Sequence, residues 1–479
     1  MSARFRCAAI ALLLVLPAAT ATAQPVTGTV AVVSGRDALA VHDLATGQEL
    51  ARFPVSGASS DIQVTREGVA ILAHTAAGQI MLVDLVARPP REVARIPSSA
   101  LGGTRPVHAY LPTEAGGRRL LIVFNDGEEA RTPHGEDPAD SSMLLVDVTP
   151  GAPTYLQPVG ELRLGRGHHK AGFSPRRARA AVSNIGDCSR VLTVVDYAEP
   201  SEPRVVRHFS AADFGFDDFT PDRTCDPTGR SGVSLAPHGV GASAATGAVF
   251  HFLTGTGQVA AVDVDAEVPS LRWVRTSGTG GNAAKDLPGG AFVVVPQRSP
   301  REWGLRAGGA PCQVGQLAVV EAAGPTLAAE VPILYDGSGC TRPLADGPER
   351  FASPTYPIAS PDGRTLFLQL GTLPTPRGTA AESRRLAVFN LADPRRPAQL
   401  PSIEVGRGNA GRDHAMTGDG RFLLVPNALD DTISVVGVAE RRVVASFPTV
   451  AGPYRLGTFG SEGPSKPVGP ATPAPSGAH

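Results

Sequence analysis

Five of the eleven histidines stand at the starts of short apolar segments that recur along the chain. These are His108 in RPVHAYLP, His168 and His169 in GHHKAGFS, His238 in APHGVGAS and His414 in GRDHAMTG. Carboxylates hold comparable positions at Asp61 in SSDIQVT and at Asp413, which precedes His414. Imidazole nitrogens and carboxylate oxygens are ligands that zinc accepts in tetrahedral sites. The pattern predicts a site for zinc or a similar divalent metal ion, provided that the fold brings these segments together.

Adjacent candidates compete at two of these positions. Neighbouring side chains in a strand point to opposite faces, so His168 and His169 cannot both enter one site. We favour His169, because it aligns with His238 relative to the turn that follows. Asp413 and His414 present the same choice, which the sequence leaves open. For any single histidine, the structural alternative is a hydrogen bond between neighbouring repeat units.

A second pattern, apolar-x-apolar-apolar-acid-apolar, defines the elements that must position these residues. It recurs at 38–45, 79–86, 142–149, 191–198, 258–265 and 316–323, and two further copies at 385–392 and 432–439 have Asn390 and Gly437 in place of the acid. Each copy is preceded by a weakly apolar segment and an apolar run, and a further run follows it. Turns rich in Gly, Asp and Asn separate the runs. Four short strands per unit are typical of a propeller blade.

The repeats predict an all-β fold, a β-propeller with eight blades, or seven if one unit is miscounted. The chain enters the second strand of a unit at TGTVAVVSG and ends with a spare first strand in GPYRLGTFG. Pairing this C-terminal strand with the first blade would close the ring and remove an exposed sheet edge. First strands line the channel of a propeller, so we expect the histidines to converge at one mouth.

The N-terminus has the features of a secretory signal peptide over residues 1–23. Arg4 and Arg6 precede an apolar run that ends in small residues, and cleavage is expected near Ala23. The chain is therefore expected to be a periplasmic protein with one propeller domain over 24–460. The Pro/Gly/Ser-rich tail over 461–479 is expected to be disordered.

Four cysteines remain after removal of the leader. An oxidising compartment favours structural disulfides over free thiolates. Four cysteines allow three pairings, of which Cys188–Cys225 and Cys312–Cys340 join sequence neighbours and are the simplest.

Composition excludes several functions. The formal net charge is -1, which rules out bulk attraction to nucleic acid or to an anionic membrane as the main activity. No apolar stretch after the leader reaches the ~18 residues of a membrane span. The chain contains no C-x-x-C-H haem motif, no G-x-S-x-G elbow, no H-E-x-x-H and no G-x-x-x-x-G-K loop. Lysine occurs only three times, which we attribute to genome composition.

The repeats resemble those of exported propellers of the YVTN and quinoprotein-dehydrogenase-like type. A narrower resemblance rests on Arg105-Pro-Val-His108, Gly167-His168-His169, and Cys225 followed by Pro237-His238-Gly239. These segments are similar to those of periplasmic zinc metallochaperones of the AztD type, which deliver zinc to the binding protein of an ABC importer. The resemblance implies zinc-binding roles for His108, His169 and His238, and a periplasmic solute-binding protein as partner.

Three functions are therefore compared. The first is a zinc-binding propeller that acts as a metallochaperone or store for a metal ABC importer. The second is a lactonase-like or metal-dependent hydrolase, with Asp61 or Asp413 as general base for a zinc-bound water. The third is a scaffold whose long loops bind another exported protein. Histidine outnumbers carboxylate at the predicted channel mouth, which favours the first function over the second.

Overall fold

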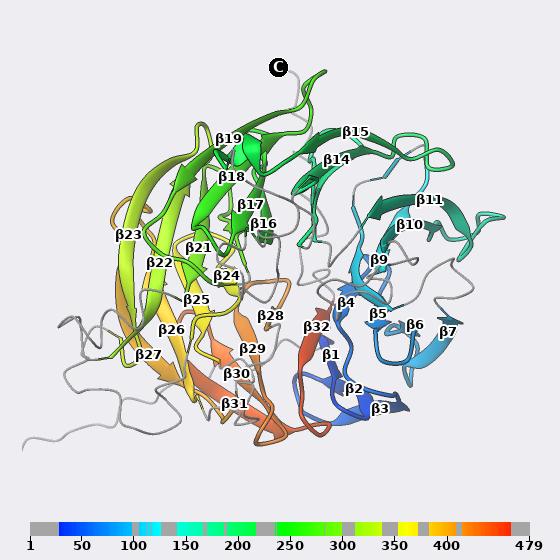
Figure 1. Cartoon of the computed structure of the whole chain (residues 1–479). Coiled ribbons are helices and arrows are strands. Elements are labelled where there is room, and N and C mark those ends of the chain that lie inside the picture. The colour runs from blue at the N-terminus through cyan, green and yellow to red at the C-terminus, as the bar shows by residue number, and fades with distance from the viewer. Residues whose placement is uncertain are drawn as a thin grey trace, which may run out of the picture.

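The computed structural model describes residues 28–460 apart from several segments. The segments outside the description are 98–104, 113, 116, 126–140, 166–169, 186–188, 217–234, 236, 282, 299–311, 338–352, 372–382 and 409–413. The described strands form eight four-stranded antiparallel sheets, set around a central axis as the blades of a propeller (Figure 1). The expected all-β propeller with eight blades is confirmed, and the seven-blade alternative is wrong.

The strands of blades 1 to 4 are given from the channel outward. Blade 1 contains β32 (Arg455–Phe459), β1 (Val30–Ser34), β2 (Ala38–Asp43) and β3 (Glu49–Pro54). Blade 2 contains β4 (Asp61–Val64), β5 (Val69–His74), β6 (Gln79–Asp84) and β7 (Arg91–Pro97). Blade 3 contains β8 (Pro106–Tyr110), β9 (Leu120–Asn125), β10 (Ser141–Asp147) and β11 (Pro158–Gly165). Blade 4 contains β12 (Ala171–Phe173), β13 (Arg179–Ser183), β14 (Leu192–Asp196) and β15 (Arg204–Phe209), followed by the short 3-10 helix η3 (Ala212–Phe214).

Blades 5 to 8 repeat the arrangement. Blade 5 contains β16 (Pro237–Ala242), β17 (Val249–Leu253), β18 (Gln258–Asp263) and β19 (Ser270–Arg275). Blade 6 contains β20 (Lys285–Asp286), β21 (Phe292–Gln297), β22 (Gln313–Glu321) and β23 (Thr326–Leu334). Blade 7 contains β24 (Pro357–Ala359), β25 (Thr365–Gln369), β26 (Arg385–Asn390) and β27 (Ala398–Glu404). Blade 8 contains β28 (Ala415–Met416), β29 (Phe422–Asn427), β30 (Thr432–Gly437) and β31 (Arg442–Pro448).

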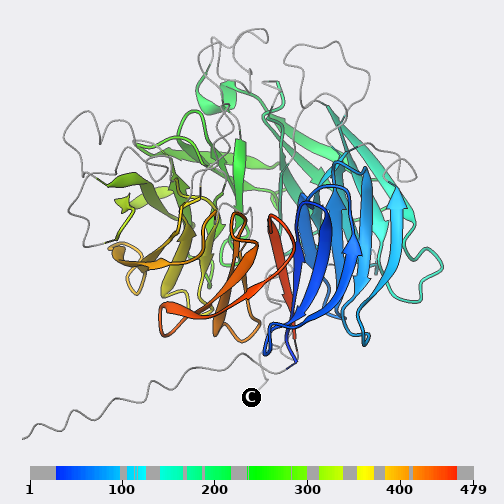
Figure 2. The same ribbon diagram turned by 90° about the horizontal axis from the view of Figure 1, so that it is seen from below.

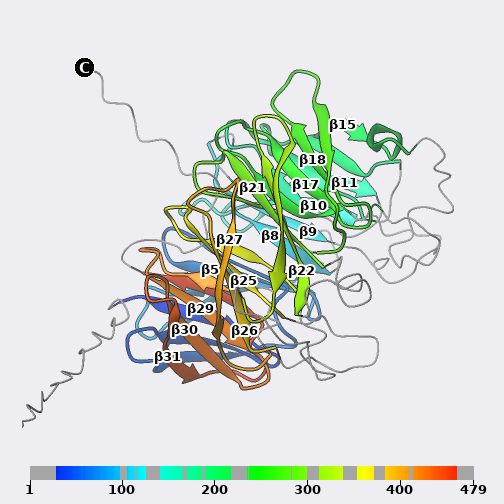
Figure 3. The ribbon, with the colours of Figure 1, turned by 90° about the vertical axis from the view of Figure 1, so that its left-hand side faces the viewer.

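The C-terminal strand closes the ring. β32 pairs antiparallel with β1, from Val30 opposite Phe459 to Ser34 opposite Arg455. Figures 2 and 3 show the last strands of the chain, in orange and red, beside the first, in blue. This closing pair confirms the expectation from the sequence and gives β1 a partner on both edges.

All eight sequence repeats become the third strand of a blade, and their recurrent acid has a local purpose. The carboxylate of Asp84 accepts a hydrogen bond from the amide of Val86 at 2.9 Å. Asp196 accepts one from Ala198 at 3.0 Å in the same way. A side chain that bonds the backbone two residues later stabilises the turn into the outer strand. The acid is therefore a turn residue and not a ligand.

The core is divided among the contacts between blades. Eight clusters of buried apolar side chains each join two neighbouring blades, one for every interface of the ring. The second and third strands are buried on both faces, whereas the outer strands are largely exposed. Apolar burial on both faces explains why the second and third strands read as continuous apolar runs.

Other expectations concern segments outside this description. The leader at 1–23 and the tail at 461–479 are among them, so the domain boundaries stay predictions. Cys312 is buried and disulfide-bonded, and the other cysteines lie in segments that are not described, so the pairing stays a prediction. No helix in the described ranges has the length and hydropathy needed to cross a membrane.

Candidate functional site

The predicted ligands that the structure describes lie at the starts of innermost strands. Asp61 begins β4, His108 lies in β8, His238 lies in β16 and His414 directly precedes β28. These four residues come from blades 2, 3, 5 and 8 at the same mouth of the channel, because all first strands run in one direction. His168, His169 and Asp413 lie outside the described residues.

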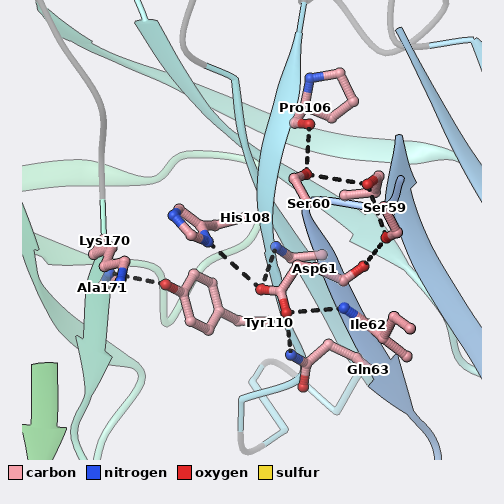
Figure 4. A network of polar contacts seen from close by, with 12 residues as sticks. Ser59, Ser60, Asp61, Ile62, Gln63, Pro106, His108, Tyr110, Lys170 and Ala171 are labelled. Atoms are coloured by element: carbon pink, nitrogen blue, oxygen red, sulfur yellow. Dashed lines mark hydrogen bonds and ion pairs between the residues drawn. The ribbon is translucent and has the colours of Figure 1, made fainter. Parts of the chain in front are cut away.

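The structure brings Asp61 and His108 together across the interface of blades 2 and 3. His108 Nδ1 lies 3.6 Å from Asp61 Oδ2, and the two side chains are 6% and 9% exposed. Asp61 is held from two sides: its Oδ1 accepts from the amide of Ile62 at 2.9 Å, and its Oδ2 from the amide of Ala109 at 3.4 Å. Figure 4 shows the second ring nitrogen of His108 pointing away from Asp61.

Two side-chain hydroxyls of blade 2 donate to the backbone at the start of β8, next to this pair. The hydroxyl of Thr75, in blade 2, donates to the carbonyl oxygen of Pro106, in blade 3, at 2.7 Å. Ser60 donates to the same oxygen at 3.3 Å (Figure 4). The starts of β4 and β8 are thereby joined directly beside the two candidate ligands.

The 3.6 Å spacing is longer than an N–H···O hydrogen bond, which spans about 2.7–3.2 Å. In a tetrahedral zinc site with bonds of about 2.0–2.1 Å, two ligand atoms lie about 3.4 Å apart. The separation of Nδ1 and Oδ2 is therefore closer to that of two ligands on one ion than to that of a hydrogen-bonded pair. The donor set also suits zinc, because it combines an imidazole nitrogen with a carboxylate oxygen.

His238 does not occupy the register position of His108. In β8, Pro106 faces Asn125 and His108 faces Phe124, so the pairing skips Val107. In β16, Pro237 faces Leu253 and Gly239 faces Phe252, so the pairing skips His238 itself. His108 therefore corresponds to Gly239, and His238 corresponds to Val107. Both strands skip the residue after proline, but His108 is the second residue after Pro106 and His238 the first after Pro237, so the sequence alignment of the two histidines was off by one residue.

His414 and His238 are the other two candidates that the structure describes. His414 is 5% exposed, and His238 is partly buried. In the described ranges no three His, Cys, Asp or Glu side chains are grouped as a metal site would require. A complete zinc site would need ligands from the segments outside this description, where His168, His169 and Asp413 lie.

Three residues at the same mouth were not predicted as site residues: Tyr110, Lys170 and Arg455. The Tyr110 hydroxyl accepts from the amide of Ala171 at 3.4 Å, which links blades 3 and 4 (Figure 4). Lys170 is 8% exposed and Arg455 is 4% exposed. The signal for Lys170 was present in the sequence, because it is one of only three lysines and directly follows His168 and His169.

Histidines in second and third strands have packing roles. His42, His74 and His251 are buried, at 0–1% exposure. Burial lowers the pKa of both His74 and His251 to about 4, and it lowers the pKa of His42 as well. The Nε2 atom of His42 contacts the Thr449 hydroxyl at 2.9 Å. These rings are neutral at physiological pH and belong to the blade interfaces.

Comparison with known proteins yields solved structures only. No protein-family model matches the chain, and no curated protein sequence matches it. The structure of apo AztD from Citrobacter koseri is 14% identical with a TM-score of 0.56, and the match covers 91% of this chain and 99% of that one. A second structure of Citrobacter koseri AztD is 13% identical with the same TM-score of 0.56, over 91% of this chain and 99% of that chain.

Other propeller structures are similar to the same degree. The dihydro-heme d1 dehydrogenase NirN, in complex with DHE, is 13% identical with a TM-score of 0.57, over 93% of this chain and 78% of that one. At these identities the likeness shows the fold alone. The chain is thus structurally similar to AztD, as its sequence resemblance implied, and it shares with AztD and NirN a propeller scaffold.

Proposed function

We propose that this protein is a periplasmic propeller that binds zinc at the channel mouth and stores it or hands it to the solute-binding protein of a metal ABC importer. The observation that carries this proposal is the buried Asp61–His108 pair, whose facing atoms are 3.6 Å apart. The resemblance to AztD in sequence segments and in fold supports the same function.

Two ligands of the proposed site are described. Asp61 Oδ2 and His108 Nδ1 would both bind the ion, and the amides of Ile62 and Ala109 would keep the carboxylate in place. His169 is proposed as the third ligand, because it stands two residues before Ala171, whose amide contacts Tyr110 of blade 3. His168 is its competitor at this position.

The other predicted ligands are proposed in a supporting role. His414 and Asp413 precede β28 in blade 8, and His238 is the skipped residue of β16 in blade 5. A site with two or three protein ligands leaves a coordination position for a ligand of a receiving protein. Such an open position suits a metal that must be transferred rather than held as a structural ion.

Equilibrium dialysis of the mature protein against zinc tests the proposal. We expect about one zinc per chain for the native protein and a large loss of affinity for Asp61→Asn and His108→Ala. Affinity should also weaken as the pH falls below ~6.5, because protons compete for the imidazole nitrogens. His208→Ala is the matched control, because His208 is an exposed histidine of the outer strand β15.

A stoichiometry near zero would refute zinc binding. So would a stoichiometry that is unchanged in the triple variant with alanine at positions 108, 169 and 238. If those alanines change nothing while trimming loops 125–141 or 209–235 abolishes binding to an exported protein, the scaffold function replaces this one. Transfer is tested separately, by adding the purified solute-binding protein to the zinc-loaded propeller and measuring which protein holds the metal.

A further inference from the structure

Four of the described residues have a positive φ although they are not glycine. They are Arg105 at 58°, Leu156 at 62°, Asp431 at 53° and Arg441 at 52°. This left-handed conformation is unfavourable for residues with a side chain, because Cβ comes close to the following carbonyl oxygen. Leu156, Asp431 and Arg441 lie in connections between paired strands of one blade, where tight turns commonly use positive φ. Arg105 lies instead between blades 2 and 3, directly before β8.

The residue after Arg105 makes its conformation harder to keep. Pro106 follows, and a proline ring restricts the preceding residue to extended conformations, with φ of about −120°. Arg105 therefore combines two unfavourable features, a side chain at positive φ and a proline neighbour. Backbone strain of this kind persists where the surrounding structure holds it, and it is concentrated at functional sites.

Two blades hold the backbone just after Arg105. The carbonyl oxygen of Pro106 accepts from the Thr75 hydroxyl at 2.7 Å and from the Ser60 hydroxyl at 3.3 Å, and both donors belong to blade 2. Pro106 also lies opposite Asn125 of β9 in blade 3. These contacts fix the point at which β8 begins.

The direction that the chain takes from this point decides where His108 lies. His108 Nδ1 is 3.6 Å from Asp61 Oδ2, and the amide of Ala109 donates to the same oxygen at 3.4 Å. Figure 4 shows the His108 ring turned toward Asp61. A change of φ at Arg105 from 58° to about −120° would rotate the adjoining backbone by about 180°. Such a rotation would turn the start of β8 relative to the chain that arrives from β7.

We infer that Arg105 is a positioning residue whose left-handed backbone, rather than its guanidinium group, sets His108 opposite Asp61. The inference rests on the proposed function, because a zinc ion held between these two side chains is what gives their placement a purpose. Arg441 offers a matched comparison within the chain. Its φ of 52° is similar, but it lies before β31 of blade 8, at the end of the blade opposite the channel mouth.

Substitutions that differ in how well they adopt positive φ test the inference, by equilibrium dialysis of the mature protein against zinc. Glycine adopts positive φ freely, asparagine tolerates it, and β-branched valine adopts it rarely. We expect Arg105→Gly and Arg105→Asn to bind zinc at least as tightly as the native protein does. Arg105→Val should bind at least about tenfold more weakly than Arg105→Gly. Arg441→Val is the control and should lower the melting temperature while leaving the zinc affinity unchanged.

Equal zinc affinities of Arg105→Gly and Arg105→Val would overturn the inference. A loss of affinity in Arg105→Gly and Arg105→Asn as large as that in Arg105→Val would also overturn it, because the guanidinium group would then be what matters. So would an equal loss in Arg441→Val, because strain anywhere in the ring would then suffice. If Arg105→Val fails to fold, Arg105→Ala decides: it also lacks the guanidinium group but has a Cβ, so it should bind about fivefold more weakly than Arg105→Gly, and equal affinities would refute the positioning role.

Crystal structures without zinc separate this inference from the proposed function. The distance between His108 Nδ1 and Asp61 Oδ2 should stay near 3.6 Å in Arg105→Gly and increase in Arg105→Val. If the native protein binds no zinc, the proposed function fails and this distance alone decides. An unchanged distance in Arg105→Val would then overturn the positioning role, and an increased distance would support it.

Discussion

Acidification should destabilise the propeller through histidines buried in the second strands. His251 in β17 is 0% exposed, and its Nε2 atom lies 3.1 Å from the carbonyl oxygen of Ala181, to which it donates. Its Nδ1 atom has no hydrogen-bond partner within the described chain. A proton on Nδ1 would place a charge in apolar surroundings, and burial accordingly lowers the pKa of His251 to about 4 from the ordinary 6.5.

The direction and size of this pH effect on the free energy of unfolding follow from the difference between the folded and unfolded pKa values of His251. The pKa of the folded state lies below that of the unfolded state, so the unfolded chain takes up the proton first as the pH falls. The stability contributed by the neutral ring is present above pH ~6.5 and is lost as the pH approaches 4. A gap of about 2.5 pKa units corresponds to about 3 kcal/mol, most of which is lost between pH 7 and pH 4.5. His74 has its pKa lowered to about 4 by burial and should add a loss of the same sign.

Urea unfolding at pH 7 and pH 4.5, followed by tryptophan fluorescence, measures this loss. Between the two pH values the free energy of unfolding of His251→Leu should fall by about 2–3 kcal/mol less than that of the native protein, whatever the stability of the variant at pH 7. The same change at His208, an exposed histidine of β15, should leave the pH dependence as it is in the native protein. Equal losses for the native protein and His251→Leu would refute the reasoning.

Three further predictions concern stability. Gln369 is 0% exposed, and neither amide atom has a hydrogen-bond partner in the described ranges, so Gln369→Leu should keep or raise the free energy of unfolding. Asn427→Leu is its matched control and should lower that free energy by about 1–3 kcal/mol, because the Asn427 amide donates to two hydroxyls. Gly160→Ala would press a methyl carbon onto the backbone of the turn after β14 and should lower the denaturation midpoint, whereas an unchanged midpoint would contradict this packing. Deleting 452–479 should give aggregated or unfolded protein by size-exclusion chromatography, because β1 loses its inner partner; deleting only 461–479 should leave the elution and melting temperature unchanged.

Most of the fold could be read from the sequence. The eight repeats, six of which carry the acid, predicted eight third strands, because apolar burial on two faces and an Asx-type turn both leave local signatures. The spare first strand at 452–460 predicted the closing pair of β32 and β1, since an unpaired edge strand needs a partner.

The channel mouth was only partly predictable. The alignment of the first-strand starts included Asp61 and His108, which the structure brings together at one interface. Both β8 and β16 skip the residue after proline, and His108 stands two residues after Pro106 whereas His238 stands one residue after Pro237. The alignment placed His238 with His108 in spite of this difference, and the two take different register positions.

The sequence by itself determined the strands, their order and the residue types that reach the channel, because these depend on local periodicity and turn chemistry. Only the tertiary structure decided which of those residues meet. The Asp61–His108 contact joins two blades, and the Lys170–Tyr356 contact joins blades 4 and 7 across the axis. Contacts between blades depend on how the ring closes and on the register of the strands in each blade, and neither is a property of any one segment.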